Sequence, residues 1–267
     1  MRHALRLALA VSAGLAFAGS AAAQTADFSE PTPPKQMTWT FDGPFGHYDL
    51  AAAQRGLQVY KEVCSACHSL NRVAFHALTG LGYDDAQVKN LAAQFQVDAG
   101  PNDQGQTVDA NGQPLKRAGT IADSFPPPFA NVQAARTANG GALPPDLSDI
   151  IKARAGGANY VYSILTGFHQ QPPKGYKLPD GKYFNPYFAG GAISMPPPLT
   201  DGSVTFADGT PATVANEAYA VVNFLAWASE PTMEERKHVG FEVMVFLIVL
   251  SGLLYLSYRK VWKGVEH

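Results

Sequence analysis

The only two cysteines of the chain, Cys64 and Cys67, stand three positions apart, and His68 follows the second. This Cys-x-x-Cys-His spacing is the pattern for covalent attachment of a c-type haem. The two thiols add across the vinyl groups of the porphyrin, and the imidazole of the next residue then reaches the iron. The motif therefore predicts one covalently bound haem c, with Cys64 and Cys67 as its thioether sites and His68 as an axial iron ligand.

Other roles for this cysteine pair lead to different functions. A thioredoxin-type redox pair needs a βαβ setting, whereas the surrounding sequence has a helical pattern. A zinc site needs two further ligands, which here would have to be scattered histidines or carboxylates. A structural disulfide would leave His68 without a role. The haem hypothesis accounts for all three residues; a thiol-redox or metal-binding protein that uses Cys64 and Cys67 is the alternative from another class.

The residues before the motif have the period of a helix. Asp49 is a suitable N-cap for its start. Apolar residues then recur at steps of three and four: Leu50, Ala53, Leu57, Tyr60 and Val63. This spacing forms one apolar stripe on a helix. We expect the helix to end at Cys64 and so to present the thiols and the imidazole to the ring.

Residues 1–23 have the three parts of a secretory signal. Arg2 and Arg6 give a positive start, residues 7–18 form an apolar stretch of 12 residues, and Ala21 to Ala23 are small. We predict cleavage after Ala23. An uncleaved anchor is the alternative, but the apolar stretch is too short to cross a bilayer. The haem domain is therefore expected in the bacterial periplasm.

Residues 239–258 form a second apolar stretch, in which Glu242 is the only charged residue. Twenty residues at about 1.5 Å per residue reach roughly 30 Å, which is one hydrocarbon thickness. Arg259, Lys260 and Lys263 follow, and such positive charge stays on the cytoplasmic side. A buried core helix is the alternative. We expect a single-pass protein of the bacterial inner membrane, with a cytoplasmic tail at residues 259–267.

The rest of the chain divides into three parts. Residues 24–48 are rich in proline without a helical period, which indicates a surface arm. Residues 49–231 form the haem domain, and residues 232–238 are juxtamembrane. The elements expected within the domain are a helix over 84–95, an exposed polar insertion over 98–119, a short helix over 160–166, a hairpin or turn over 201–209, and a closing helix from Thr210 and Pro211 to near Pro231, with Val214, Ala218, Val221, Val222, Leu225 and Ala228 facing inward.

Two proline-rich segments are candidates to contact the ring. Residues 141–148 suit a rigid segment beside an axial histidine, but they equally fit the start of a helix that Asp146 caps. The other segment contains Met195, followed by three prolines. A thioether raises the haem potential, and elimination among the five methionines leaves Met195. His76, His169 and an open coordination position remain alternatives at this point.

Four stretches together resemble the cytochrome c1 family, the haem subunits of cytochrome bc1 complexes, in its bacterial form. They are residues 63–70, 141–148, 183–188 and 227–231. Three of the four carry no general haem signal, so their joint presence separates this family from other membrane-tethered c-type cytochromes. The resemblance implies a mainly α fold: a class I cytochrome c-like domain with loop insertions, followed by one C-terminal transmembrane helix.

The resemblance also implies roles for individual residues. It implies that Met195 is the sixth ligand, that Arg154 and Tyr160 meet the haem propionates, and that Asn139, Pro145 and Phe188 line the pocket. Some bacterial members have a disulfide near the sixth ligand, but this chain lacks those cysteines. Another element must therefore hold the Met195 loop, and the prolines after it are a candidate.

The implied function is electron transfer within a quinol:cytochrome c oxidoreductase of a respiratory or photosynthetic chain, with no catalytic side chain in this subunit. The subunit would accept an electron from a Rieske iron-sulfur protein and pass it to a soluble c-type cytochrome. It would lie beside cytochrome b in a dimeric complex. A membrane-anchored c-type cytochrome that serves a terminal oxidase is the alternative.

The charge balance gives a separate hint about partners. Residues 24–238 contain 15 Lys and Arg against 20 Asp and Glu, a net charge of −5. An acidic domain attracts a basic soluble protein and speeds their encounter at low ionic strength. We expect no nucleic-acid partner.

Overall fold

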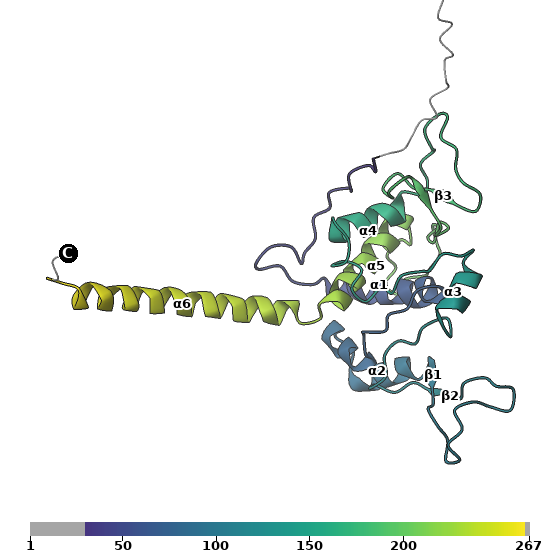
Figure 1. Cartoon of the computed structure of the whole chain (residues 1–267), viewed down its shortest axis with the longest axis horizontal. Helices are drawn as coiled ribbons and strands as arrows, with labels where there is room; N and C mark the ends of the chain where they lie inside the picture. Colours follow the sequence, from purple (N-terminus) through teal and green to yellow (C-terminus); the bar gives the residue numbers. More distant parts are fainter. Residues whose placement is uncertain (1–29, 265–267) are drawn as a thin grey trace, which may run out of the picture.

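The computed structural model describes residues 30–264. The signal sequence expected at residues 1–23, the first residues of the arm and residues 265–267 lie outside the described residues. Within them, a mainly helical domain carries one long helix, α6 (Met233–Val261), that projects away from it (Figure 1). This arrangement confirms the expected fold class.

Two helices, α1 (Leu50–Glu62) and α5 (Val214–Ser229), cross at the centre of the domain. The Asp49 carboxylate caps α1 by accepting a hydrogen bond from the amide of Ala52. Gly56 lies at the crossing, where a Cβ atom would stand 2.1 Å from the carbonyl oxygen of Ala220. A larger residue would push the helices apart, so the close crossing depends on glycine.

Helix α5 begins three residues later than expected from Thr210 and Pro211. The Thr213 hydroxyl is the cap, because it accepts a hydrogen bond from the amide of Asn216. The helix ends before Pro231, as predicted. Of the positions expected to face inward, Val214 is half-buried and the others are buried: Ala218, Val221, Val222, Leu225 and Ala228.

An aromatic cluster fills the core on the other side of α1. The Phe125 ring contacts Tyr60, Phe75 and Phe95 at centroid distances of 5.6, 4.5 and 5.3 Å. The short helices η2 (Phe75–Leu81) and α2 (Asp85–Ala92) pack there. Helix α2 has the predicted start, where Asp84 forms a capping box, but it is shorter than the predicted range of 84–95.

Two small antiparallel sheets complete the domain. Strands β1 (Gln96–Asp98) and β2 (Lys116–Ala118) close the base of the polar insertion, whose intervening residues are nearly all exposed. Strands β3 (Tyr183–Phe184) and β4 (Ala192–Ile193) pair as a second hairpin. Helices α3 (Val132–Ala138) and α4 (Gly157–Thr166) lie between them in the chain. Helix α4 begins three residues before the predicted start at 160.

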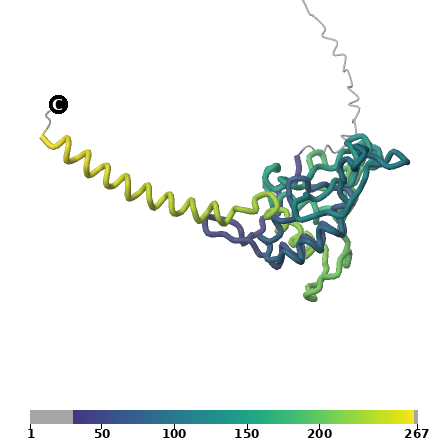
Figure 2. Tube along the Cα trace, turned by 90° about the horizontal axis from the view of Figure 1, so that it is seen from below, coloured from purple at the N-terminus to yellow at the C-terminus, as the bar shows by residue number. Residues whose placement is uncertain are grey.

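The segment 30–48 runs along the surface of the domain to the start of α6 (Figure 2). The buried ring of Trp39 stacks between Phe41 and Tyr219. The amide of Lys35 donates to the Ser163 hydroxyl of α4. These contacts fix the segment on α4 and α5.

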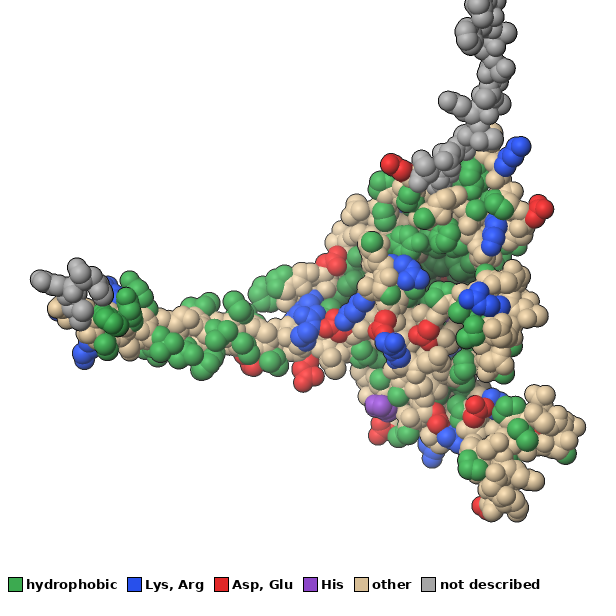
Figure 3. Space-filling model, in the orientation of Figure 1, with side chains coloured by type: hydrophobic (Ala, Val, Ile, Leu, Met, Phe, Trp, Pro, Cys, Tyr) green, Lys and Arg blue, Asp and Glu red, His purple; other side chains and the backbone are tan. Residues whose placement is uncertain are grey.

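Helix α6 contains the apolar stretch predicted at 239–258. Its most apolar window has a mean hydropathy of 2.3, and none of this window is buried within the chain. Hydrophobic side chains cover the helix, whereas charged side chains gather where it leaves the domain (Figure 3). Its 29 residues are long and apolar enough to cross a bilayer.

Candidate functional site

A cavity of about 510 Å³ opens between α4, α5 and the segment that follows α1. This volume lies within the range of about 300–1,000 Å³ usual for cofactor sites. Within the described chain, His76 and His169 are not among the residues that line it. The nine residues that the haem motif and the family resemblance predict for the site do line it: Cys64, Cys67, His68, Asn139, Pro145, Arg154, Tyr160, Phe188 and Met195.

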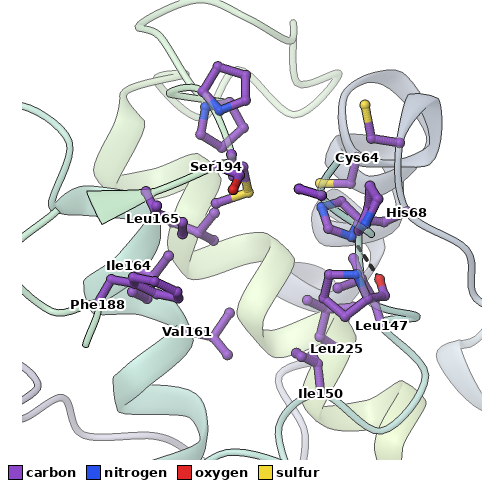
Figure 4. Close-up of a pocket in the computed structure, with 18 of the residues that line it drawn as sticks. Cys64, His68, Leu147, Ile150, Val161, Ile164, Leu165, Phe188, Ser194 and Leu225 are labelled. Carbon is purple, nitrogen blue, oxygen red and sulfur yellow. Dashed lines mark hydrogen bonds between the residues drawn. The ribbon is translucent and has the colours of Figure 1, made fainter. Parts of the chain in front are cut away.

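Local hydrogen bonds position the cysteine motif. After α1 the chain turns through η1 (Cys64–Ala66), and the amides of Cys67 and His68 both donate to the Cys64 carbonyl. Cys64 and His68 therefore lie on the same side of the cavity (Figure 4). Burial raises the pKa of the Cys64 thiol to about 12, and the neighbouring Cys67 adds to the shift. Redox-active thiols have lowered pKa values, so this environment does not favour thiol-redox chemistry.

The surroundings of the His68 ring favour the tautomer and the charge state that can bind a metal. Its Nδ1 atom lies 2.8 Å from the carbonyl oxygen of Pro145. Because a carbonyl can only accept, Nδ1 carries the proton and Nε2 keeps its lone pair. Burial lowers the pKa of His68, although the Pro145 hydrogen bond and the charge of Asp146 oppose the shift. The neutral imidazole that results is the form that binds a metal.

Asp146, the next residue after Pro145, holds this segment beside His68 through hydrogen bonds. Its carboxylate accepts hydrogen bonds from the Ser69 hydroxyl at 2.7 Å and from the amides of Asn71 and Ser148 at 2.9 and 2.8 Å. Residues 147–155 form turns instead of a helix capped by Asp146. Of the two structures that the sequence allowed for residues 141–148, the rigid segment beside the histidine is the one observed.

The opposite wall carries Met195. Ser194 lies across the cavity from Cys64 and His68 (Figure 4), and Met195 follows it in the chain. The ammonium of Lys182 donates to the Ser194 hydroxyl at 2.6 Å. Asn185 follows β3 in the hairpin that leads to Met195, and it is fully buried. Its side-chain NH2 donates to the Ile164 carbonyl of α4, and its side-chain oxygen accepts from the backbone amide of Tyr187.

The chain after Met195 is held by α5. The fully buried carboxylate of Glu217 accepts hydrogen bonds from the Ser203 hydroxyl and the Val204 amide at 2.5 and 3.2 Å. The Asp201 carboxylate accepts from the Val214 amide at 2.8 Å. The sequence analysis named only the prolines for this task and missed these side chains, because no local spacing connects them to Met195.

Arg154 and Tyr160 lie on one part of the cavity wall. Arg154 is exposed and Tyr160 is half-buried. Burial raises the pKa of Tyr160, and the nearby charge of Arg154 acts in the opposite direction. A guanidinium beside a phenol hydroxyl offers donors to carboxylate groups at the edge of a bound ring.

Helix α4 supplies an apolar wall that the sequence analysis did not assign. Val161, Ile164 and Leu165 line the cavity opposite His68, together with Phe188 (Figure 4). Their spacing of three and four residues is the signal that could have revealed this face. On α5, Val221 and Leu225 line the cavity; the sequence analysis placed both facing inward.

These residues fit a haem. The cavity has mainly apolar walls, as a flat hydrophobic ring requires, with a neutral imidazole on one wall, a thioether on the other and two thiols at the rim. His and Met are the axial pair of c-type cytochromes. Among residues 30–264, no group of three or more His, Cys, Asp or Glu side chains could hold a metal ion.

Comparison with known proteins identifies relatives of the chain. It is 46% identical to "Cytochrome b/c1" of Bradyrhizobium diazoefficiens over 94% of its length, but it spans only 39% of that protein. It is 45% identical to "Cytochrome c1" of Rhodospirillum rubrum, over 96% of this chain and 97% of that one. It is also 46% identical to "Cytochrome c1, heme protein, mitochondrial" of Saccharomyces cerevisiae, over 85% and 72%.

A sequence profile gives the same assignment. The profile of the Cytochrome C1 family matches residues 39–265, which include every residue that lines the cavity. This match extends over most of the chain, and the Rhodospirillum rubrum relative matches it nearly from end to end. The chain therefore belongs to the cytochrome c1 family.

Proposed function

We propose that this chain is the electron-transfer subunit of a quinol:cytochrome c oxidoreductase and carries one covalently bound haem c. The observation that supports it most is the pair of donors on opposite walls of one cavity, His68 with a protonated Nδ1 and Met195, beside two thiols. Two relatives have names that refer to haem or to a cytochrome b-c1 complex.

Each side chain has a defined task in this proposal. Cys64 and Cys67 would hold the group covalently, and His68 and Met195 would bind its iron, which would exclude other ligands. Arg154 and Tyr160 bind the propionates, and Asn139, Pro145 and Phe188 shape the pocket. When bound, haem c supplies one-electron exchange at its iron. No side chain of this subunit makes or breaks a substrate bond.

The partners follow from the proposed complex. The subunit accepts an electron from a Rieske iron-sulfur protein and delivers it to a soluble c-type cytochrome, in a dimeric assembly with cytochrome b. The name "Cytochrome b/c1" of the Bradyrhizobium relative supports a cytochrome b neighbour. Helix α6 anchors the subunit as a single span, with the haem domain in the periplasm and the basic C-terminal end in the cytoplasm.

Covalent attachment is tested by a haem stain after denaturing electrophoresis. We expect the wild-type band to stain and the double variant Cys64→Ala, Cys67→Ala to lose the stain. Ser65→Ala is the matched control, because it changes the same motif without removing a thiol, and it should stain like the wild type. A wild-type band without stain would contradict the proposal and favour the thiol-redox or metal-binding alternative.

Co-purification distinguishes this complex from the terminal-oxidase alternative. We expect the solubilised full-length protein to purify with a b-type cytochrome and a Rieske protein, as shown by optical spectra and electron paramagnetic resonance. Purification with an oxidase instead, and without a Rieske signal, would refute the assignment to this complex.

The acceptor is tested by ionic strength. Because the domain between residues 24 and 238 has a net charge of −5, from 15 Lys and Arg against 20 Asp and Glu, it should attract a lysine-rich cytochrome. We expect stopped-flow electron exchange to slow by tenfold or more as salt rises from about 10 to 200 mM, where the Debye length falls below ~10 Å. A rate that rises or stays constant would exclude electrostatic docking.

A further inference from the structure

Phe45 exposes an aromatic ring beside the start of α6. The side chain is 78% exposed, more than Phe246 in the middle of the apolar helix at 62%. Its ring packs edge-on against Phe241 of α6, with 6.1 Å between the centroids. A single exposed apolar residue is common on protein surfaces, whereas a contiguous exposed apolar patch marks a contact surface. Here the surface is continuous with the apolar face of α6.

The loop that carries Phe45 has a defined structure. The amide of Asp42 donates to the Trp39 carbonyl, and the amide of His47 donates to the Thr40 carbonyl at 2.9 Å. At Gly46 a Cβ atom would stand 2.2 Å from the Asp42 carbonyl oxygen, so this tight loop needs glycine there. The exposure of Phe45 is therefore a property of the fold.

Hydrogen bonds connect this loop to the first turns of α6. The ammonium of Lys237 donates to the carbonyl oxygens of Phe41 and Gly46 at 2.8 and 3.1 Å. The amide of Tyr48 donates to the Glu234 carboxylate at 2.7 Å. Figures 1 and 2 both show the loop beside the start of α6.

The same segment also holds the end of α5. The Tyr48 hydroxyl donates to the carbonyl oxygens of Ala226 and Glu230 at 3.2 and 2.9 Å. The loop thus bridges the junction between α5 and α6, where the chain would otherwise connect the domain to α6 only through residues 230–232. Such a bridge restricts the angle between the haem domain and the helix.

The position along α6 identifies what the ring contacts. Phe241 is the third residue of the apolar stretch 239–258, so it lies about 3 Å along the axis from its outer end. Lys237 lies about one turn further out, at the level of lipid headgroups. Lysines with long stems extend to this boundary, and exposed phenylalanine side chains can bury themselves between the headgroups and the acyl chains.

We propose that the loop 41–47 is a second membrane contact, in which Phe45 inserts into the headgroup boundary of the outer leaflet and Lys237 holds the loop against α6. The loop thereby fixes the tilt of the haem domain over the bilayer. This inference rests on the proposed anchoring of the chain by α6.

Site-directed spin labelling tests the contact in the haem-loaded full chain. With Cys64 and Cys67 bonded to haem, Phe45→Cys introduces a single free thiol. The label is measured in vesicles of phosphatidylcholine and phosphatidylglycerol by its relative accessibility to oxygen and to a water-soluble nickel chelate. Met244→Cys on the apolar helix and Val108→Cys in the exposed insertion are the lipid and water references, with native exposures of 58% and 45%.

We expect the oxygen-to-nickel ratio at position 45 to lie several-fold above that at 108 and below that at 244. A ratio equal to that at 108 would overturn the inference while leaving the anchor intact. A water-like ratio at 244 would refute the anchor itself. Protection from both reagents in the intact complex would show a neighbouring subunit at Phe45 in place of lipid, which also overturns the inference.

A second variant tests the bridge. Lys237→Met removes both hydrogen bonds to the loop and keeps a long apolar side chain. In the Phe45→Cys background we expect the ratio to fall at least twofold towards the value at position 108. Lys260→Met, at the other end of α6, is the control and should leave the ratio unchanged. An unchanged ratio in the Lys237 variant would exclude this role for Lys237.

Discussion

His68 and Met195 occupy opposite walls of one cavity, but different kinds of contact hold them in place. The His68 wall begins with hydrogen bonds between residues three or four positions apart, in α1 and the turn after it. The Met195 wall depends on a hairpin that is attached to α4 through Asn185 and on a following loop attached to α5 through Glu217. The backbone turn of the His68 wall is local, although its ring is positioned by the distant Pro145 carbonyl, whereas the Met195 wall is attached to α4 and α5 through Asn185 and Glu217.

The two walls of the cavity should differ in stability. Local hydrogen bonds can form before the domain is complete, whereas the contacts of the Met195 wall join segments from different parts of the chain. Sub-global opening generally begins where few side chains are buried, and most of residues 171–183, which lead into the Met195 hairpin, are exposed. We therefore expect the Met195 wall to loosen first when the protein is heated or its loops are changed.

The largest effect should come from His68 and Met195, the two proposed iron ligands. Met195→Leu should keep covalent haem but lose the near-infrared band of the thioether–iron bond. Its midpoint potential should fall by on the order of 100 mV or more, because axial ligands set haem potentials over a range of about 0.8 V. His68→Gln should yield little stable holoprotein. Redox titration and the haem content of purified protein measure both; an unchanged spectrum in Met195→Leu would show that another residue is the ligand.

Removing the Asn185 side chain should be the next largest change. Asn185→Ala deletes a buried donor and a buried acceptor and leaves their partners on Ile164 and Tyr187 unpaired. We expect a loss of about 2–4 kcal/mol in unfolding free energy, with loss of the thioether band before global unfolding. Asn102→Ala, in the exposed insertion, should cost under about 0.5 kcal/mol. Equal denaturant midpoints for the two variants would contradict this role.

The His68 wall should respond to acid through Asp146. Burial alone would raise the pKa of Asp146, but hydrogen bonds from Asn71, Ser148 and Ser69 outweigh it and lower the pKa. A carboxyl group with a lowered folded-state pKa stabilises the fold above its unfolded pKa of about 3.9 and loses this effect as pH falls through the folded value.

The variant Asp146→Asn should therefore differ most from the wild type at neutral pH, by about 1–3 kcal/mol in unfolding free energy. The difference should begin to shrink below about pH 4, where Asp146 becomes protonated in the unfolded chain, and it should vanish below the lowered folded-state pKa. Denaturant unfolding between pH 7 and 3 measures it, with Asp103→Asn as the control in the exposed insertion. A difference that does not depend on pH would mean that the Asp146 charge is not involved.

The smallest effect should come from Lys182. Lys182→Met removes the hydrogen bond to the Ser194 hydroxyl next to Met195. Because Lys182 is only half-buried, we expect a cost of about 0.5–1 kcal/mol and loss of the thioether band at a slightly lower temperature. Lys177→Met, on the exposed part of the same loop, serves as the control. If both variants lose the band at the wild-type temperature, Asn185 and Glu217 suffice to hold the loop.

Features that depend on local spacing were predictable from the amino-acid sequence alone. The haem motif, the stripe of α1, the inward positions of α5 and the apolar stretch within α6 can be read this way, because their residues recur at helical intervals or form one short pattern. The start of α5 was misplaced by three residues, since Thr210 and Thr213 offer equivalent caps and only the Asn216 hydrogen bond distinguishes them. The family resemblance, which the comparisons confirm, came from the same short stretches.

How the two walls meet depends on contacts between distant parts of the chain. Asp146 bonds to residues more than 70 positions earlier, Tyr48 bonds to the ends of α5 and α6, and Gly56 sets the distance between α1 and α5. A periodic sequence pattern cannot predict such contacts, because each contact joins two segments that can lie any number of residues apart in the chain. The chemistry of this protein can therefore be predicted from a few adjacent residues, whereas the geometry of its cavity depends on the packing of the whole domain.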